Sequence, residues 1–285
     1  MLEAGLHFGH GTATARDEAC WMASHVLEMP PDFEAAAFDR RVGEESRSAL
    51  DALLERRIRS RRPLAYLIGE AWFAGLAFEV DEHTLIPRSP LAELVIDGLT
   101  PWQDFRQPLR VLDVGTGCGC IAVALASYWP ALRVDAVDIS EPALIRARAN
   151  ADRHAVARRV NFKRSDVFSA LDGRRYDLII SNPPYVPNDS MTELPEEYLH
   201  EPDAALRAGD DGLDIVRRLL AGAFDHLRPG GQLLIEVGEA QPQTERLLDG
   251  VESLWLEFRH GGEGVVLLDR DACRQCRERF PESSR

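Results

Sequence analysis

Short apolar segments alternate with helical patterns from Leu109 onward, and this alternation constrains the fold more than any other feature of the sequence. Apolar runs of strand length predict five strands, at Leu109–Val114, Arg133–Asp138, Val160–Arg164, Tyr176–Ser181 and Gln232–Val237. Helical spacing lies between them at Ile121–Ser127, Pro142–Asp152 and Leu213–Leu227. Strands that alternate with helices imply a parallel sheet covered by helices on both faces. The sequence therefore predicts an α/β domain.

The last two apolar segments, Leu254–Phe258 and Gly264–Leu268, have no helical pattern between them. They are joined through the glycine-containing stretch His260–Gly262, which is typical of a β-hairpin. A hairpin at this point adds an antiparallel strand to an otherwise parallel sheet. We therefore predict a seven-stranded sheet whose last strand is antiparallel.

The chain before this domain has a different pattern. Two amphipathic helical stretches, Asp17–Leu27 and Glu44–Arg62, are each ended by proline, and residues 1–70 contain no convincing strand. The segment Trp72–Ile86 changes to a strand-like period around a glycine, and helical spacing resumes at Leu91–Leu99. We predict a helical domain at residues 1–70, a β-hairpin linker at 71–90 and the α/β domain at 91–285.

The charge balance limits the possible partners. Lys and Arg number 33 against 47 Asp and Glu, so the net charge is −14 and the isoelectric point is about 5.1. Such a surface repels a phosphate backbone, so we expect no direct nucleic-acid binding and a basic partner instead. No run of 18 apolar residues occurs, and we expect no membrane association.

Five cysteines are spread unevenly along the chain, which is unlike a disulfide framework. Cys273 and Cys276 have CxxC spacing, but a structural zinc site needs four ligands and no second pair is present. We therefore expect reduced thiols, no metal and a cytoplasmic protein without a signal peptide.

A glycine-rich loop follows the first strand of the sheet and its Asp113. Its residues are candidates for cofactor binding: Gly115, Thr116, Gly117, Cys118 and Gly119. Glycine lets the backbone turn tightly and approach a ligand, with the N–H groups of the next helix facing it. Asp138, at the end of the second strand, is placed to bind both hydroxyls of a ribose. The two features together predict an adenosine-containing cofactor.

The spacing of the glycines discriminates between cofactors. Dinucleotide-binding loops read GxGxxG, whereas this loop reads GxGxG with Cys120 at the sixth position. That spacing and the reversed final strand resemble the S-adenosyl-L-methionine-dependent methyltransferases of class I, which have a Rossmann-like fold. The resemblance implies that Asp113 lies near the methionine amino group, and that Asp166 accepts from the adenine amine. It also implies that Ile139 and Val167, which follow the second and third strands, contact the bound S-adenosyl-L-methionine.

The tetrapeptide Asn182-Pro183-Pro184-Tyr185, called here the NPPY turn, directly follows the apolar fourth strand. Two prolines lock the backbone into a rigid turn. That turn would aim the Asn182 amide oxygen and the Pro183 carbonyl at one point, where they would accept both hydrogens of a planar amino group. Tyr185 would offer a flat face for stacking. The turn resembles that of methyltransferases acting on glutamine amides or on nucleobase amines. The resemblance assigns Asn182, Pro183 and Tyr185 to catalysis, all four residues of the turn to substrate binding, and Asn182 also to cofactor binding.

The chemistry of an amide sets the mechanism. Its nitrogen is a poor nucleophile because the lone pair is delocalised, and holding both hydrogens would direct electron density toward the methyl group. No strong base is required before transfer, and the rate would come from positioning and preorganised electrostatics. A sulfonium supplies the driving force, so no metal is needed.

Motifs along nearly the whole chain resemble the bacterial protein-glutamine methyltransferases, in particular the branch that modifies large-subunit ribosomal protein L-three. These motifs are Phe8–Thr12, Arg62–Leu67, Ala71–Phe73, Ile86–Pro90, Leu194–Tyr198, His200–Pro202 and Phe258–Gly264. The sibling branch, which acts on peptide-release factors, tends to have Pro-Arg-Pro followed by Thr-Glu where this chain has Pro87–Pro90. The resemblance implies glutamine methylation of the ribosomal protein, free or in an assembly intermediate. Release-factor methylation and adenine-amine methylation of nucleic acid are the alternatives.

Overall fold

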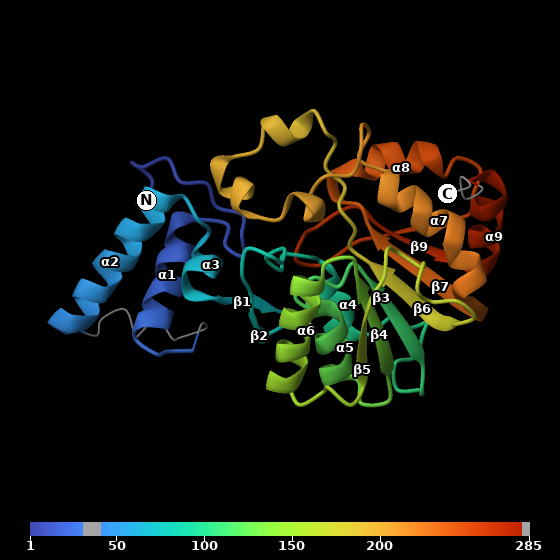
Figure 1. The fold of residues 1–285 in the computed structure, drawn as a ribbon, viewed down its shortest axis with the longest axis horizontal. Helices are drawn as coiled ribbons and strands as arrows, with labels where there is room; N and C mark the ends of the chain where they lie inside the picture. Colours follow the sequence, from blue (N-terminus) through green and yellow to red (C-terminus); the bar gives the residue numbers. More distant parts are fainter. Residues whose placement is uncertain (31–40, 281–285) are drawn as a thin grey trace.

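The computed structural model describes residues 1–30 and 41–280. Three helices form the N-terminal part: α1 (Ala15–Val26), α2 (Glu44–Ser60) and α3 (Leu64–Ile68). Thr14 caps α1, because its hydroxyl oxygen accepts from the backbone N–H of Asp17 at 3.2 Å. Figure 1 shows these helices at one end of the molecule, with α7 and α9 at the other.

A small hairpin follows these helices, as the sequence predicts. Its strands β1 (Glu70–Phe73) and β2 (Leu76–Glu79) pair antiparallel through a turn at Ala74 and Gly75. Both turn residues have positive φ, 49° and 73°, as a type I′ turn requires. Helix α4 (Leu91–Asp97) comes next. The division into units at residues 70 and 90 stays a prediction.

The main sheet has seven strands in the order β5-β4-β3-β6-β7-β9-β8, and the class I α/β fold is confirmed. Their bounds are β3 (Arg110–Val114), β4 (Arg133–Asp138), β5 (Val160–Arg164), β6 (Tyr176–Ser181), β7 (Leu227–Glu236), β8 (Leu254–Leu256) and β9 (Val265–Asp269). Strands β3 to β7 are parallel, and β9 runs antiparallel to both β7 and β8. The reversed last strand is thus confirmed, and it lies between β7 and β8.

Helices cover both faces of this sheet (Figure 1). One face packs against α4, α5 (Cys120–Tyr128) and α6 (Glu141–Arg153), and the other against α7 (Asp214–His226) and α9 (Arg270–Arg279). In β6, Leu178 and Ile180 enter the first core and Ile179 enters the second. Burial on both faces explains why the central strands β3 and β6 are mostly apolar.

Several boundaries differ from the sequence prediction, and the largest difference is at the start of β7. The predicted helix Leu213–Leu227 ends at His226, and the strand predicted from Gln232 begins earlier, at Leu227. Leu227 pairs with Tyr176, and the register then shifts before Leu178 pairs with Gln232. Residues 228–231, which contain a proline and two glycines, hide this first pairing from a pattern-based reading.

A long excursion lies between β6 and α7 and contains the 3₁₀ turns η2 (Ser190–Thr192), η3 (Glu196–His200) and η4 (Asp203–Ala205). It begins and ends at one place, because Val186 donates to the carbonyl of Leu206 at 2.8 Å and accepts from Ala208 at 2.9 Å. We call residues 187–206 the overhang. Figure 1 shows it arching between the N-terminal helices and the sheet.

The C-terminal helix α9 and the short helix α8 (Gln241–Leu247) were not predicted. Cys273 and Cys276 lie on the buried side of α9, in the core that it shares with α7. Among residues 1–30 and 41–280, no group of three or more His, Cys, Asp or Glu could hold a metal ion. Within the same ranges, no helix is long and apolar enough to cross a bilayer.

Candidate active site

The carboxyl ends of β3, β4 and β6 meet at one edge of the sheet. Strands β4 and β5 extend the sheet on one side of β3, and the chain then crosses back to place β6 on its other side. This reversal of strand order makes a topological switch point at β3. The glycine loop after β3 and the NPPY turn after β6 are neighbours there. A Cβ placed on Gly115 would lie 3.9 Å from the backbone oxygen of Asn182. The two segments singled out by sequence are therefore brought together.

The glycine loop has the conformation that its sequence predicts. Gly115, Gly117 and Gly119 all have positive φ, at 74°, 56° and 83°. A Cβ on Gly117 would meet open space, whereas one on Gly119 would lie 3.0 Å from the Cβ of Ala147 in α6. The loop is therefore open toward the sheet edge and tightly packed beneath.

The residues between these glycines are supported from below. Thr116 and Cys118 are buried, and Asn150 of α6 donates to the carbonyl of Cys118 at 2.9 Å. The same Asn150 side chain also bonds the backbone N–H and carbonyl of Glu79, at 2.8 Å and 3.0 Å. One side chain thus fixes the loop to the hairpin strand β2.

Asp113 lies at the end of β3 beneath the loop and is fully buried. One carboxylate oxygen accepts from the hydroxyl of Thr116 at 2.6 Å, and the other, Oδ1, has no hydrogen-bond partner among residues 1–30 and 41–280. Burial raises the pKa of this carboxyl to about 7. A buried acceptor without a partner is what a cationic amino group of a ligand would satisfy.

Asp138 ends β4 and faces the same loop. Its two oxygens accept from the backbone N–H of Gly117 at 2.8 Å and of Ser140 at 2.9 Å. Burial raises its pKa although these N–H groups oppose the shift. Each oxygen keeps a free lone pair, so both could accept from the hydroxyls of a ribose. Ile139, the next residue, is 54% exposed and offers an apolar surface beside it.

Asp166 and Val167 follow β5. The carboxylate of Asp166 is half-exposed and pairs with Arg218 of α7 at 2.8 Å. Val167 is buried at 8% exposure with a positive φ of 50°, which a β-branched residue rarely adopts. The predicted adenine contact of Asp166 stays a prediction, in which the carboxylate would be shared with Arg218.

The NPPY turn is fixed to the neighbouring strands at its start. Ser181, the last residue of β6, donates its hydroxyl to the carbonyl of Val114 at 2.7 Å. Pro183 is buried, whereas Asn182 and Pro184 are partly exposed at the sheet edge. The turn therefore presents a polar side chain on a rigid backbone, as predicted.

Tyr185 closes one side of the turn. A Cβ on Gly238 would lie 2.8 Å from the Cζ of Tyr185, so the ring packs directly on the backbone of that glycine. Burial raises the pKa of Tyr185 to about 12, which keeps the phenol neutral at neutral pH. A fixed neutral ring is suited to stacking with an amide.

Two further polar residues at this edge were missed by sequence reasoning. Glu236, the last residue of β7, is 4% exposed, and its carboxylate accepts from the hydroxyl of Ser89. The side-chain amide of Asn182 is a polar neighbour of this carboxylate and acts to lower its pKa. Burial raises the pKa of Glu236 to about 7. The sequence contains an indication of this residue, because Glu236 follows the apolar run Leu233–Ile235 at the end of a strand, just as Asp138 stands at the end of its own strand.

A network of mostly buried charges joins the N-terminal part to the overhang, and no local sequence pattern indicates it. Glu201 accepts from both Nη1 and Nη2 of Arg88 at 2.7 Å, and lies 3.4 Å from Nε2 of His10. Glu197 forms an ion pair with Arg61 at 3.0 Å and accepts a hydrogen bond from Nη1 of Arg57 at 3.4 Å. We call these residues and Glu18, which pairs with Arg57, the junction.

Comparison with known proteins was made against this geometry. The family described as PrmC N-terminal domain matches residues 8–69, and the family described as Methyltransferase small domain matches residues 102–210. The ribosomal protein uL3 glutamine methyltransferase of Xanthomonas campestris pv. campestris is 46% identical over 99% of this chain and 90% of its own length. That of Bordetella pertussis is 41% identical over 94% of this chain and 90% of its own length.

Solved structures share the fold. A methyltransferase from Pyrococcus furiosus is 20% identical, covers 78% of this chain and 98% of its own, and superposes with a TM-score of 0.50. The hMettl16 catalytic domain, crystallised with MAT2A 3'UTR hairpin 6, covers 68% of this chain and 75% of its own at 19% identity and a TM-score of 0.52.

The sheet with its reversed strand, the open glycine loop and the unpartnered Asp113 oxygen define a methyltransferase that uses S-adenosyl-L-methionine. The donor fits these residues, because its amino group and ribose require the acceptors that Asp113 and Asp138 offer. More narrowly, the chain belongs to the family of ribosomal protein uL3 glutamine methyltransferases, as its identity to them over nearly its whole length shows.

Proposed function

We propose that this enzyme transfers the methyl group of S-adenosyl-L-methionine to the side-chain amide nitrogen of a glutamine in ribosomal protein uL3, the large-subunit protein L-three. The observation that carries the proposal is the position of the NPPY turn beside the glycine loop, with Asn182 close to Gly115. Full-length identity to relatives named for that reaction supports the same substrate. When bound, the donor supplies an electrophilic methyl group on a sulfonium.

In this proposal the glycine loop holds the donor from Gly115 to Gly119. The carboxylate of Asp113 accepts from its amino group, and that of Asp138 accepts from its ribose. Ile139, Asp166 and Val167 border the adenine. The support for these roles is the open space above Gly117, the unpartnered Oδ1 of Asp113 and the free lone pairs of Asp138.

The target glutamine is held by the NPPY turn. The oxygens of Asn182 and Pro183 accept the two amide hydrogens, while Tyr185 stacks on the amide plane and Pro184 holds the turn rigid. Holding both hydrogens in the plane directs the electron density of the nitrogen toward the methyl group. The nitrogen loses one proton to solvent as it becomes cationic. No residue therefore has to remove a proton before the methyl group is transferred.

Charge supports a ribosomal protein as the partner. The net charge of this chain is −14, and proteins that bind ribosomal RNA are basic, so long-range attraction favours the encounter. The same charge disfavours nucleic acid as the substrate. We propose that the enzyme meets its substrate in the cytoplasm, free or in an assembly intermediate, while the glutamine is accessible.

The test is methyl transfer from labelled donor to purified uL3 and, in parallel, to a release factor, with mass spectrometry to locate the site. Label on one glutamine of uL3 alone is expected. Label on the release factor instead would keep the chemistry and replace the substrate, and label on nucleic acid alone would overturn the amide assignment.

Asn182→Ala is expected to lower kcat by about 10²–10³-fold, as the loss of one preorganised polar contact to the reacting group does, while donor binding is kept. Asn161→Ala is the matched control, because Asn161 is an exposed asparagine on β5 that bonds Asp135. Turnover of Asn182→Ala equal to that of this control would remove Asn182 from the catalytic site.

A further inference from the structure

Glu236 is a buried carboxyl at the active-site edge to which the proposed reaction assigns no role. It is 4% exposed and is the last residue of β7. Two residues further along, Gly238 packs against the ring of Tyr185. Burial of an acid is costly unless its oxygens are hydrogen-bonded, so its partners matter. They are Ser89, from the segment before α4, and Asn182, from the NPPY turn.

The sheet register places Glu236 beside Asn182. Strands β6 and β7 are parallel, with Ile180 opposite Leu234 and Ser181 opposite Ile235. The next residues of the two chains are Asn182 and Glu236, so the contact follows from the register of the two strands. It does not depend on the conformation of a flexible loop.

Ser89 is constrained to donate to Glu236. The backbone N–H of Leu91 donates to the hydroxyl oxygen of Ser89 at 3.1 Å, which occupies a lone pair of that oxygen. The hydroxyl hydrogen is therefore free to point at the Glu236 carboxylate, which accepts it. Ser89 thus fixes the carboxylate in place and leaves its other lone pairs for Asn182.

An asparagine amide has two ends with opposite hydrogen-bonding character. The nitrogen donates and the oxygen accepts, and a half-turn about the last bond of the side chain exchanges them. An ionised carboxylate only accepts, so it must face the Asn182 nitrogen. The oxygen of Asn182 is then left free of the carboxylate and available to accept from another donor.

We infer that Glu236 is a positioning residue, held by Ser89, that fixes the orientation of the Asn182 amide so that its oxygen faces the substrate amide. The inference rests on the proposed function for the identity of that substrate. With the amide reversed, the Asn182 nitrogen would meet the hydrogens of the substrate, and the contact would be repulsive.

Protonation of Glu236 would undo this arrangement. A protonated carboxyl carries an O–H donor, which can bind the Asn182 oxygen and hold the amide in the reversed orientation. The charged or titratable groups around Glu236 are Arg88, whose charge favours the ionised form, and Tyr185, which stays neutral. Because burial raises the pKa of Glu236 to about 7, activity is expected to fall as the pH is lowered through that value.

A spectroscopic test needs no substrate. The chain has four asparagines, at positions 150, 161, 182 and 188, so asparagine-selective ¹⁵N labelling gives four side-chain amide signals. The signal lost in Asn182→Ala identifies Asn182. It is expected to titrate with a midpoint near pH 7 in the wild type and to stop titrating in Glu236→Gln, while the signal of Asn161 stays unchanged in both. An Asn182 signal that is the same in the wild type and in Glu236→Gln at every pH would overturn the inference.

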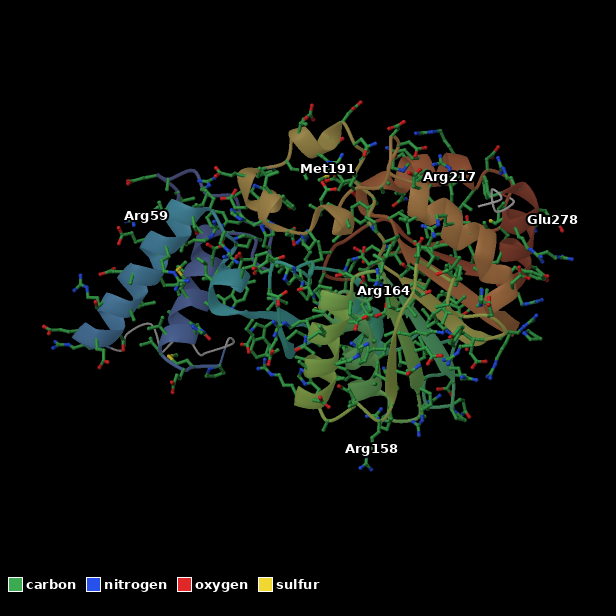
Figure 2. All side chains as sticks on the ribbon, in the orientation of Figure 1. Arg59, Arg158, Arg164, Met191, Arg217 and Glu278 are labelled. Atoms are coloured by element: carbon green, nitrogen blue, oxygen red, sulfur yellow. The ribbon has the colours of Figure 1, made fainter. Side chains whose placement is uncertain are left out.

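A kinetic test uses Glu236→Gln and Ser89→Ala, with Glu278→Gln as the matched control. Glu278 is exposed on α9, far from the site in Figure 2. Glu236→Gln is expected to lower kcat at least tenfold with the donor Kd unchanged, and to flatten the pH profile between pH 6 and 8. Ser89→Ala is expected to move the midpoint of that profile upward, because the carboxylate loses a donor. Wild-type kcat and profile in Glu236→Gln would contradict the positioning role.

The two tests separate this inference from the proposed function. If wild-type enzyme does not methylate uL3 but the Asn182 signal titrates through Glu236, the substrate assignment fails and the positioning role stands. If uL3 is methylated and the Asn182 signal ignores Glu236, the proposed function stands and the positioning role fails.

Discussion

The molecule holds buried carboxylates in two regions, and they differ in what faces them. In the junction, the carboxylate of Glu201 accepts from Nη1 and Nη2 of Arg88 and from the backbone N–H of Ile86. At the active-site edge, Asp113 has one hydroxyl donor and an unpartnered oxygen, and Glu236 is bonded to neutral groups.

The pKa values follow this difference in opposite directions. Burial alone would raise the pKa of Glu201, but Arg88 and His10 lower it to about 2. Nothing of opposite charge bonds to Asp113 or Glu236, and burial raises the pKa of each to about 7. Glu18 is the exception in the junction, since burial outweighs its bond with Arg57 and raises its pKa.

The contrast distinguishes carboxylates that stabilise the fold through ion pairs from carboxylates that have no cationic partner in the free enzyme. A carboxylate with a structural role has its cation built into the fold, whereas the site keeps acids that are stabilised only when substrate or donor arrives. Burying these acids without a cationic partner therefore lowers the stability of the free enzyme.

Removing a cation from the junction is expected to have the largest effect. Arg57→Met would leave Glu18 and Glu197 buried without their shared partner, since Arg57 is fully buried between them. Breaking one side of a buried ion pair costs about 3–5 kcal/mol of the free energy of unfolding. Chemical denaturation followed by helical circular dichroism measures the loss.

The same helix provides the control for this change. Arg59 of α2 pairs with Glu55, but its side chain is 78% exposed and points outward in Figure 2. Arg59→Met is expected to cost less than about 0.5 kcal/mol, as surface pairs do. Equal losses for the two variants would show that the junction stabilises no more than a surface pair.

Acid is expected to weaken the junction next. The pKa of Glu201 is lower in the folded protein than its ordinary 4.5, so its contribution is complete above pH 4.5 and disappears as the pH falls through about 2. A shift of this size corresponds to about 3 kcal/mol. The free energy of unfolding between pH 7 and pH 3 should therefore fall more steeply for wild type than for Glu201→Gln. Parallel curves would refute the pairing with Arg88.

The pKa of the site carboxylate Asp113 is shifted in the opposite direction to that of Glu201, and its effect is expected to be smaller. Its pKa near 7 means that the ionised form, which binds the amino group of the donor, is a minority at pH 6 and the majority at pH 8. Affinity for S-adenosylhomocysteine is expected to rise about tenfold over this range, a free-energy change of about 1.4 kcal/mol. Calorimetry in buffers of different ionisation enthalpy would record the released proton.

Two variants assign that proton to its group. Asp113→Asn should bind weakly, with a flatter dependence on pH. Glu236→Gln should keep the tenfold rise, because Glu236 lies at the NPPY turn. A rise abolished by Glu236→Gln and kept in Asp113→Asn would reverse the assignment.

Most of the sheet could be predicted because each parallel strand is a short apolar run. Strands β3 to β6 lie within one residue of their predicted bounds, and the final hairpin was predicted as well. Helix α9 was missed because all of its residues except Ala272, Cys273 and Cys276 are polar or charged, which masks its apolar side. The overhang was missed because 3₁₀ turns have no long sequence period.

The site divides in the same way. Asp113 and Asp138 lie at the ends of strands, and the glycine loop and Asn182 directly follow strands, so position along the chain was enough to find them. Glu236 and Ser89 act through tertiary neighbours, because β7 must lie beside β6 and the linker must cross its end. No local pattern encodes those adjacencies, which explains why Glu236 and Ser89 were missed.

The strand order also affects how the chain is made. Strand β8 leaves the ribosome before β9, yet it joins the sheet only through pairing with β9. Until Val265–Asp269 have emerged, β7 therefore shows a bare hydrogen-bonding edge next to Glu236. A chain stopped before this point would expose an apolar strand edge of the kind that pairs with other chains. Premature termination near the end of synthesis should thus yield aggregates rather than a partly active enzyme.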